Sequence, residues 1–183
     1  MAQRFNATGF AVKTFEEFPL WDAAQCASVI DLAQTRGQSS GRSEGVRSAT
    51  RWWLDAKDFP EICGDLRVLI DRANHWGFET FWAVEGLPSV EVVRYRLGDF
   101  YKPHTDWGPQ YNTRKMSVSV QLSKPEDYEG GQVLLHDGPE PWPITTEQGK
   151  ATVWPSWTLH EVEPMMSGER WAMVAWCLGP SFC

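Results

Sequence analysis

The sequence predicts an α+β protein in which helices come first and a jelly roll of short strands follows. Before about residue 78, two segments place apolar residues at helical spacing. Beyond that point, short apolar or alternating runs are separated by clusters of Gly, Pro, Asp and Asn, the pattern of a sandwich or barrel. The chain of 183 residues suits a single domain. We expect residues 1–78 to form a mainly helical support and residues 79–183 to form the strand-built core.

The first helix is expected to begin after Asp22, because Asp22 and Gln25 have the spacing of a capping box. Gly37 is suited to end it. The polar residues 38–45 then read as a flexible loop. The apolar side of this helix would consist of Val29, Ile30, Leu32 and Ala33.

The second helix is expected to begin near Asp58, with Pro60 in its first turn, where proline is tolerated. Gly77 is a plausible end. Its apolar side would consist of Ile62, Leu66, Leu69, Ile70, Ala73 and Trp76.

Strands are expected over residues 80–85, 90–97, 116–122, 132–136, 151–154, 158–163 and 171–178. The run from Ser117 to Leu122 alternates, with Ser117, Ser119 and Gln121 on one face and apolar residues on the other. The polar face either meets solvent, as is usual for an antiparallel sheet, or lines a polar pocket. This strand alone leaves both readings open.

Three residues in this chain have the chemistry of a metal site. His104 and Asp106 form an H-x-D pair, and His160 follows far downstream. Residues at i and i+2 of an extended segment project to the same side, so His104 and Asp106 can reach one ion. Two imidazoles and one carboxylate are the usual ligands of non-haem Fe(II) oxygenases, although they also suit zinc.

Arg170, ten residues after His160, suggests a small acid as a second partner of this site. Residues 164–169 read as a hairpin turn, which would place Arg170 on the strand paired with that of His160. A planar guanidinium grips a carboxylate through two hydrogen bonds. The alternative is a surface ion pair. His75, near a helix end, and His136, before a turn, are less favoured as site residues.

The bulk composition limits the partners and the compartment. A net charge of −7 and a pI near 5.1 argue against nucleic acid or an anionic membrane as a partner. The cysteines (Cys26, Cys63, Cys177 and Cys183) form no C-x-x-C motif, and neither a signal peptide nor a long apolar run is evident. We therefore expect free thiols and a cytoplasmic location.

Five ordered blocks of sequence resemble one known family. They are residues 95–106 (YRLGDFYKPHTD), 114–122 (RKMSVSVQL), 127–131 (DYEGG), 154–156 (WPS) with 159–162 (LHEV), and 168–176 (GERWAMVAW). Together they are similar to the Fe(II)/2-oxoglutarate-dependent oxygenases, in particular the prolyl 4-hydroxylase-like branch. The resemblance implies a double-stranded β-helix, the distorted jelly roll of that family.

The same resemblance implies roles for individual residues. His104, Asp106 and His160 would bind Fe(II), and Arg170 would pair with the distal carboxylate of 2-oxoglutarate. Trp176 would form a wall of the pocket. Relatives often present tyrosines to this cosubstrate; Tyr95 matches one such position, and Gln121 stands where some relatives have tyrosine. Tyr101 would hold the metal loop or contact the cosubstrate.

The implied reaction uses Fe(II), 2-oxoglutarate and O2 to hydroxylate an unactivated C–H bond, with succinate and CO2 as by-products. A prolyl residue of a peptide or protein is the substrate that the branch name suggests. A free amino acid or another small metabolite fits as well, because fold and motif do not fix the substrate.

The residues alone leave two other classes of protein open. One is a non-catalytic jelly-roll binding module. The other is a zinc hydrolase, in which Arg170 would have no role. Candidate substrate determinants lie over residues 47–53 and 107–113, with ordinary packing as the alternative. For the basic spots at Arg42, Arg47 and Arg51 and at Arg114 and Lys115, a solvated surface is the favoured reading.

Overall fold

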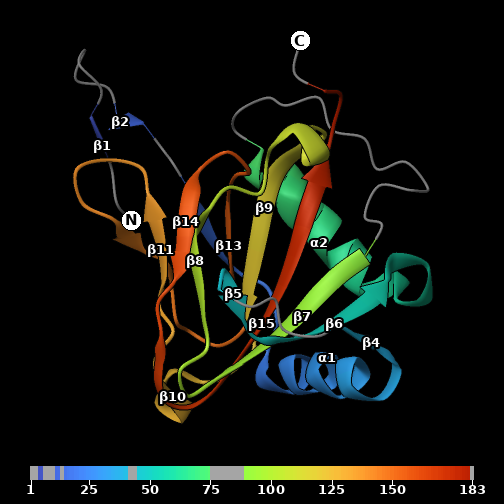
Figure 1. The fold of residues 1–183 in the computed structure, drawn as a ribbon. Coiled ribbons are helices and arrows are strands. Elements are labelled where there is room, and N and C mark those ends of the chain that lie inside the picture. The colour runs from blue at the N-terminus through green and yellow to red at the C-terminus, as the bar shows by residue number, and fades with distance from the viewer. Residues whose placement is uncertain (1–3, 6–10, 13–14, 41–44, 75–88, 182–183) are drawn as a thin grey trace.

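The computed structural model describes residues 4–5, 11–12, 15–40, 45–74 and 89–181. In this part of the chain, two β-sheets form a jelly roll, and two helices cover the outer face of the larger sheet (Figure 1). The predicted fold class is confirmed. The strand expected over residues 80–85, His75, Trp76 and Gly77 lie outside the described residues.

Helix α1 (Ala23–Arg36) begins at the predicted capping box. The Gln25 backbone N–H donates to Asp22 Oδ1 at 2.9 Å, and the Asp22 N–H donates to Gln25 Oε1 at 3.0 Å. Gly37 ends the helix, and its N–H donates to the carbonyl oxygen of Ala33. A Cβ there would lie 2.8 Å from the Cβ of Trp52, so close packing requires this glycine.

Helix α2 (Pro60–Ala73) carries Pro60 in its first turn, as predicted. Its N-cap is Phe59, which makes no side-chain capping bond, so the expected cap at Asp58 is not formed. The helix ends at Ala73, before the predicted Gly77. Its buried side consists of Ile62, Leu66, Leu69, Ile70 and Ala73.

The larger sheet has the strand order β3-β13-β9-β15-β7-β6-β4, with β10 also paired to β15. Its strands are β3 (Glu16–Pro19), β4 (Gln38–Ser40), β6 (Thr50–Asp55), β7 (Ser89–Arg96), β9 (Arg114–Gln121), β10 (Tyr128–Gly130), β13 (Lys150–Pro155) and β15 (Met165–Leu178).

The smaller sheet has the order β12-β11-β14-β8-β5. Its strands are β5 (Arg47–Ser48), β8 (Phe100–His104), β11 (Val133–His136), β12 (Trp142–Pro143) and β14 (Leu159–Val162). Outside both sheets, β1 (Arg4–Phe5) pairs with β2 (Ala11–Val12). The short 3-10 turns are η1 (Ala56–Asp58), η2 (Pro109–Tyr111) and η3 (Pro125–Asp127).

The description of residues 1–78 as a mainly helical support needs correction. This region contributes β3, β4 and β6 to the larger sheet and β5 to the smaller one. The segment expected as a loop over 38–45 begins with β4, which pairs with β6 through Ser39 and Trp52. β3, β4 and β5 have only two to four residues, which carry too little periodicity to be recognised from sequence. β6 has six residues, but its sequence TRWWLD does not alternate between apolar and polar residues.

Alternation along the central strands divides their side chains between two cores. One core joins the outer face of the larger sheet to both helices and includes Leu54, Val92 and Met173. The other lies between the sheets and includes Val93 and Leu135. Polar side chains that face this inner space meet the smaller sheet instead of solvent, and they form the site described next.

Candidate metal centre

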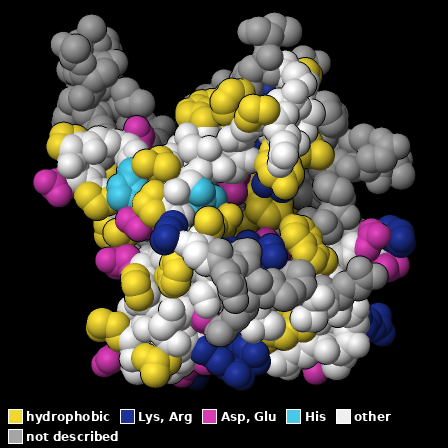
Figure 2. Space-filling view, viewed as in Figure 1, with side chains coloured by type: hydrophobic (Ala, Val, Ile, Leu, Met, Phe, Trp, Pro, Cys, Tyr) yellow, Lys and Arg dark blue, Asp and Glu magenta, His cyan; other side chains and the backbone are white. Residues whose placement is uncertain are grey.

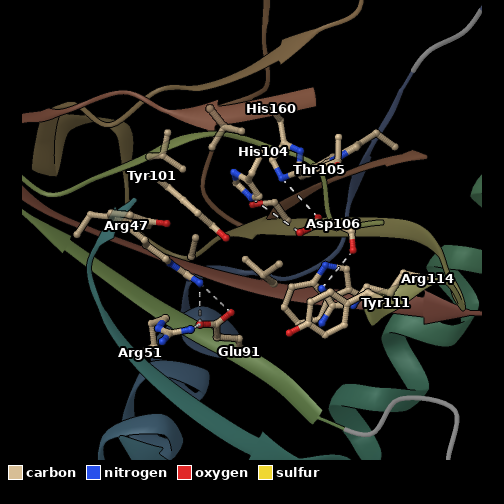
Figure 3. Close-up of a pocket in the computed structure, with 18 of the residues that line it drawn as sticks. Arg47, Arg51, Glu91, Tyr101, His104, Thr105, Asp106, Tyr111, Arg114 and His160 are labelled. Carbon is tan, nitrogen blue, oxygen red and sulfur yellow. Dashed lines mark hydrogen bonds and ion pairs between the residues drawn. The ribbon is translucent and has the colours of Figure 1, made fainter. Parts of the chain in front are cut away.

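His104, Asp106 and His160 converge between the two sheets (Figure 3). His104 ends β8 and lies directly opposite His160 on the neighbouring strand β14. Asp106 lies in the bend after β8, where its N–H donates to the carbonyl oxygen of Ser156 at 2.9 Å. The candidate ligand atoms of the three residues all lie within 4.8 Å of one another.

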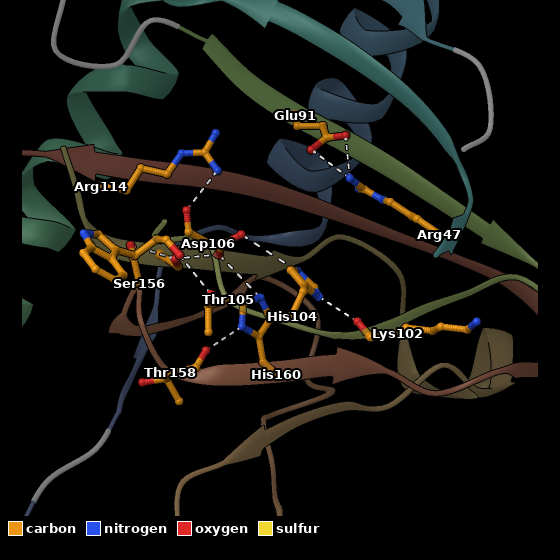
Figure 4. Close-up of polar contacts among 12 residues, drawn as sticks. Arg47, Glu91, Lys102, His104, Thr105, Asp106, Arg114, Ser156, Thr158 and His160 are labelled. Carbon is orange, nitrogen blue, oxygen red and sulfur yellow. Dashed lines mark hydrogen bonds and ion pairs between the residues drawn. The ribbon is translucent and has the colours of Figure 1, made fainter. Parts of the chain in front are cut away.

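Both imidazoles are oriented by backbone carbonyls (Figure 4). Nδ1 of His104 lies 2.8 Å from the Lys102 carbonyl oxygen, and Nδ1 of His160 lies 2.9 Å from that of Thr158. Nδ1 is therefore the protonated nitrogen in each neutral ring. Nε2 of His160 lies 3.4 Å and Nε2 of His104 3.9 Å from the Asp106 carboxylate. Burial, reinforced by nearby His160, lowers the pKa of His104 to about 4, so this ring is neutral at neutral pH.

Asp106 is held as an ionised carboxylate. The Ser117 hydroxyl donates to Asp106 Oδ2 at 2.6 Å, and Ser156 Oγ lies 3.0 Å from Ser117 Oγ. Burial opposes ionisation, but His160, the Ser117 hydroxyl and His104 outweigh it, and the pKa of Asp106 lies below its usual range. Two imidazoles and one carboxylate that converge on one point match the usual ligand set of non-haem Fe(II).

Tyr101 supports the metal cluster from the side. Its ring stacks on the imidazole of His104, with centroids 3.5 Å apart and planes 19° apart. The guanidinium carbon of Arg47 lies over the Tyr101 ring, 4.6 Å from its centroid. Tyr101 was expected to hold the metal loop or to contact the cosubstrate. The structure shows that it contacts His104 and lines the pocket.

A cavity of about 180 Å³ opens from the cluster and contains Arg170 in its lining. Arg170 is only 2% exposed, and its Nε and one terminal nitrogen donate to Gln121 Oε1 at 3.2 and 2.9 Å. Gln121 therefore orients the guanidinium that we predicted from the sequence to bind a small acid. Figure 2 shows the hollow between the sheets, with basic side chains gathered in it.

The expected pairing of the strands of Arg170 and His160 is wrong. β14 pairs with β8 and β11, whereas β15 pairs with β7, β9 and β10. The chain crosses from one sheet to the other at residues 163–164, because β15 already begins at Met165. Arg170 and His160 thus line the same pocket from opposite sheets.

The open question about the polar face of β9 is settled in favour of the pocket. Ser117, Ser119 and Gln121 are at most 4% exposed. Ser117 contacts Asp106, Ser119 lines the pocket, and Gln121 contacts Arg170. The smaller sheet covers this face, so the polar side chains of β9 contact residues of the site and do not meet solvent.

Tyr95 and Trp176 also line the pocket, on the larger sheet. Tyr95 is 3% exposed, and its ring centroid lies 5.6 Å from the guanidinium carbon of Arg170. Burial raises the pKa of Tyr95, so its phenol is neutral. Trp176 contacts Trp53 from β6, with ring centroids 6.2 Å apart.

Sequence reasoning missed Glu91, and it placed Arg114 on a solvated surface. Glu91 is 1% exposed on β7 and pairs with Arg47 and Arg51, while Arg114 lies between Tyr111 and Trp176. All of these residues line the pocket. One signal could have revealed Glu91: it is the only charged residue in the apolar run Val90 to Val93.

Comparisons with known proteins agree with this site. A family model described as the 2OG-Fe(II) oxygenase superfamily matches residues 90–178. A PKHD-type hydroxylase from Parvibaculum lavamentivorans is 37% identical over 159 residues, which are 82% of this chain and 73% of the relative. The chain belongs to the 2OG-Fe(II) oxygenase superfamily. The resemblance inferred from the sequence blocks is therefore confirmed.

A further relative and two solved structures extend the comparison. A PKHD-type hydroxylase from Maricaulis maris is 36% identical over 104 residues, 56% of this chain, and the match spans 47% of that relative. A prolyl-4-hydroxylase from Pseudomonas putida has a TM-score of 0.71 at 19% identity, with 92% of this chain and 94% of the other covered. A viral collagen prolyl hydroxylase from Paramecium Bursaria Chlorella virus-1, in a 2OG complex, has a TM-score of 0.70 at 20% identity, with 92% and 97% covered. These structures show the shared fold.

The family's two small partners, Fe(II) and 2-oxoglutarate, match the donors present: the His-Asp-His cluster and a buried guanidinium in one cavity. Within the described residues, helices are too short or too polar to cross a bilayer.

Proposed function

We propose that this protein is an Fe(II)- and 2-oxoglutarate-dependent dioxygenase that hydroxylates an unactivated C–H bond. The observation that carries this proposal is the placement of the His104–Asp106–His160 cluster and the buried Arg170 in one cavity. A zinc hydrolase would leave Arg170 and its Gln121 partner without a role. A binding module without chemistry would not need two imidazoles and a carboxylate gathered around one point.

In this proposal His104, Asp106 and His160 would hold Fe(II), and such a ligand set leaves coordination positions for small ligands. When bound, the metal and cosubstrate supply the oxidising power for C–H hydroxylation, while the protein supplies orientation and excludes water. The carbonyls of Lys102 and Thr158 fix both rings. Because Asp106 provides a ligand carboxylate, the site favours hydroxylation over halogenation.

Arg170 is proposed to bind the distal carboxylate of 2-oxoglutarate. Its depth in the cavity favours a strong charge-assisted pair, since little water competes there. Gln121 accepts from two of its nitrogens, which leaves the guanidinium in one fixed orientation. Tyr95 and Trp176 would flank the cosubstrate on the larger sheet.

A prolyl residue of a peptide or protein is the proposed substrate, supported by relatives named PKHD-type hydroxylases and structural neighbours named prolyl hydroxylases. A free amino acid or small metabolite is the second candidate, supported by the charged lining of the cavity. Free thiols at Cys26, Cys63 and Cys177 agree with a reducing compartment, and we propose the cytoplasm.

The test is turnover of the cosubstrate. The purified protein is loaded with Fe(II) without oxygen, then given 2-oxoglutarate and O2, and succinate is measured with and without pools of peptides and amino acids. Succinate that depends on Fe(II) supports the proposal, and its increase with one pool indicates the substrate class. Absence of succinate under every condition, including slow turnover without substrate, would refute it.

A further inference from the structure

The cavity is more basic than the protein that contains it. The chain has a net charge of −7, yet the lining includes the arginines Arg47, Arg51, Arg114 and Arg170. Its carboxylates, among the described residues, are Glu91 and the proposed metal ligand Asp106. If Arg170 binds 2-oxoglutarate, a second group of guanidiniums is still present in the same cavity.

Arg47 and Arg51 are arranged around one buried acid (Figure 3). Nη1 of Arg47 lies 3.1 Å and Nη1 of Arg51 lies 3.2 Å from Glu91 Oε1. β6 and β7 run antiparallel with Arg51 opposite Val93 and Trp53 opposite Glu91, so these side chains share the pocket face. Among the described residues of the lining, this wall therefore presents two guanidiniums around one carboxylate.

Arg114 adds a guanidinium on another side of the cavity. It lies between two aromatic rings, 4.1 Å from the Tyr111 centroid and 3.9 Å from that of Trp176. Burial lowers the pKa of Arg114, but a guanidinium stays protonated at neutral pH. Both rings contact the guanidinium, and one of its nitrogens donates to the backbone carbonyl of Asp106 at 3.5 Å. Arg114 is thus held beside the proposed metal centre.

We propose that the substrate carries a carboxylate, which binds the basic wall formed by Arg47, Arg51 and Arg114, with Glu91 as a positioning residue for Arg47 and Arg51. This inference rests on the proposed function and names the chemical class of its substrate. A cationic substrate is disfavoured because Glu91 is already shared by two guanidiniums. The carboxylate belongs either to a free acid or to an acidic side chain of a peptide.

Binding of matched acids and amides tests this inference without turnover. The protein is loaded anaerobically with Fe(II) and 2-oxoglutarate, and calorimetry measures the binding of three pairs: L-proline and L-prolinamide, L-aspartate and L-asparagine, and acetyl-Gly-Asp-Gly-amide and acetyl-Gly-Asn-Gly-amide. At least one acid is expected to bind about tenfold more tightly than its amide, the size of one charge-assisted pair. The pair that shows the preference distinguishes a free acid from a peptide side chain.

Arginine variants locate the preference. Arg51→Gln and Arg114→Gln are each expected to reduce the acid-to-amide ratio by about threefold or more, because each removes one pairing charge. Arg36→Gln is the matched control, since it removes an exposed guanidinium at the end of α1. In succinate assays, Arg51→Gln should raise the KM for the preferred acid more than it lowers kcat.

Amides that bind as tightly as their acids, an acid preference that survives both variants, or no binding by any of the acids would overturn the inference. The proposed function is tested separately by succinate formation without added substrate. A protein that makes succinate but shows no acid preference therefore refutes only the carboxylate-bearing substrate. A protein that makes no succinate but binds acids refutes only the dioxygenase.

Discussion

Each imidazole of the proposed metal centre is fixed from behind by one backbone carbonyl, and the carboxylate is fixed by one hydroxyl. Lys102, Thr158 and Ser117 supply these groups. Such partners orient a ligand and raise its affinity for metal. Removing a ligand should therefore affect iron binding far more than folding.

His160→Ala is expected to weaken Fe(II) binding by at least about 100-fold, because loss of a ligand exceeds the effect of losing a supporting group. Succinate formation should fall with it. Equilibrium dialysis under nitrogen, followed by iron analysis, measures the affinity. His136→Ala is the control, since His136 pairs with Glu161 at 2.8 Å and is not part of the cluster. Full iron binding by His160→Ala would remove it from the ligand set.

Arg170→Ala is expected to raise the apparent KM for 2-oxoglutarate by about tenfold to 100-fold, the value of a charged hydrogen bond. Gln121→Ala should raise it less, because Gln121 acts only through the orientation of Arg170. Steady-state succinate assays over a range of 2-oxoglutarate concentrations give both values. An unchanged KM in Arg170→Ala would mean that another residue anchors the cosubstrate.

Among single residues, the sequence predicted that His104, Asp106 and His160 share one site with Arg170, because their chemistry is rare and their spacing is informative, and the structure places all four around one cavity. Glu91 was not identified, since its partners Arg47 and Arg51 lie about forty residues earlier in the chain. A buried acid is recognisable only when the groups that neutralise it are known. Ser117 and Ser156 were missed as partners of Asp106 for the same reason.

β15 contributes side chains both to the site and to the hydrophobic core. It pairs with β7 on one side and β9 on the other, so Arg170 lies beside Tyr95 and the strand of Gln121. Its pocket face carries Arg170, Ala172, Val174 and Trp176, and its other face packs towards the helices. Period-2 alternation therefore places the site and the core on opposite faces of one strand.

Glu91→Ala is expected to lower the free energy of unfolding by about 3 kcal/mol, because it leaves buried guanidinium charge without its carboxylate. Urea denaturation followed by fluorescence measures the change. Glu126→Ala, in the exposed turn η3, is the control and should change stability by less than about 0.5 kcal/mol. Equal stability of the two variants would show that Glu91 is not a structural counter-ion.

Among the elements, both helices and most of the longer strands in the described part were predicted, because their periodicity extends over enough residues to be read. The pairing of β14 with β15 was wrong. Sequence neighbours separated by a short turn usually pair, but in a jelly roll the chain also crosses between sheets at such turns. Short strands such as β5, β10 and β12 were missed, since two or three residues carry no pattern.

The protein is acidic as a whole, but its cavity is lined by several arginines. A net charge of −7 disfavours anionic partners at the surface, while the cavity wall formed by Arg47, Arg51 and Arg114 attracts them locally. Salt screens the attraction between these arginines and an anion, so binding of an acid should weaken as salt rises. This arrangement agrees with a small acidic group as the part of the substrate that enters the cavity.

The stability of the metal-free protein should depend on pH through His104. Burial and His160 lower its pKa from 6.5 to about 4, so the unfolded chain binds a proton in this interval and the folded chain does not. Stability is thus unaffected above pH 6.5 and falls as the pH decreases towards 4, by up to about 3 kcal/mol.

Urea unfolding of the wild type and of His104→Gln, at pH values from 7 to 4, isolates this group because glutamine does not titrate. The wild type should lose stability relative to the variant as the pH falls. A constant difference between the two proteins would mean that His104 is not buried as a neutral ring.

The most direct measurement is a crystal structure of the protein grown without oxygen in the presence of Fe(II) and N-oxalylglycine, a non-reactive analogue of 2-oxoglutarate. We predict an iron anomalous peak bonded to Nε2 of His104, Nε2 of His160 and the Asp106 carboxylate, with the distal carboxylate of the analogue paired to Arg170. Iron bound elsewhere, or an analogue whose distal carboxylate lies away from Arg170, would contradict the account.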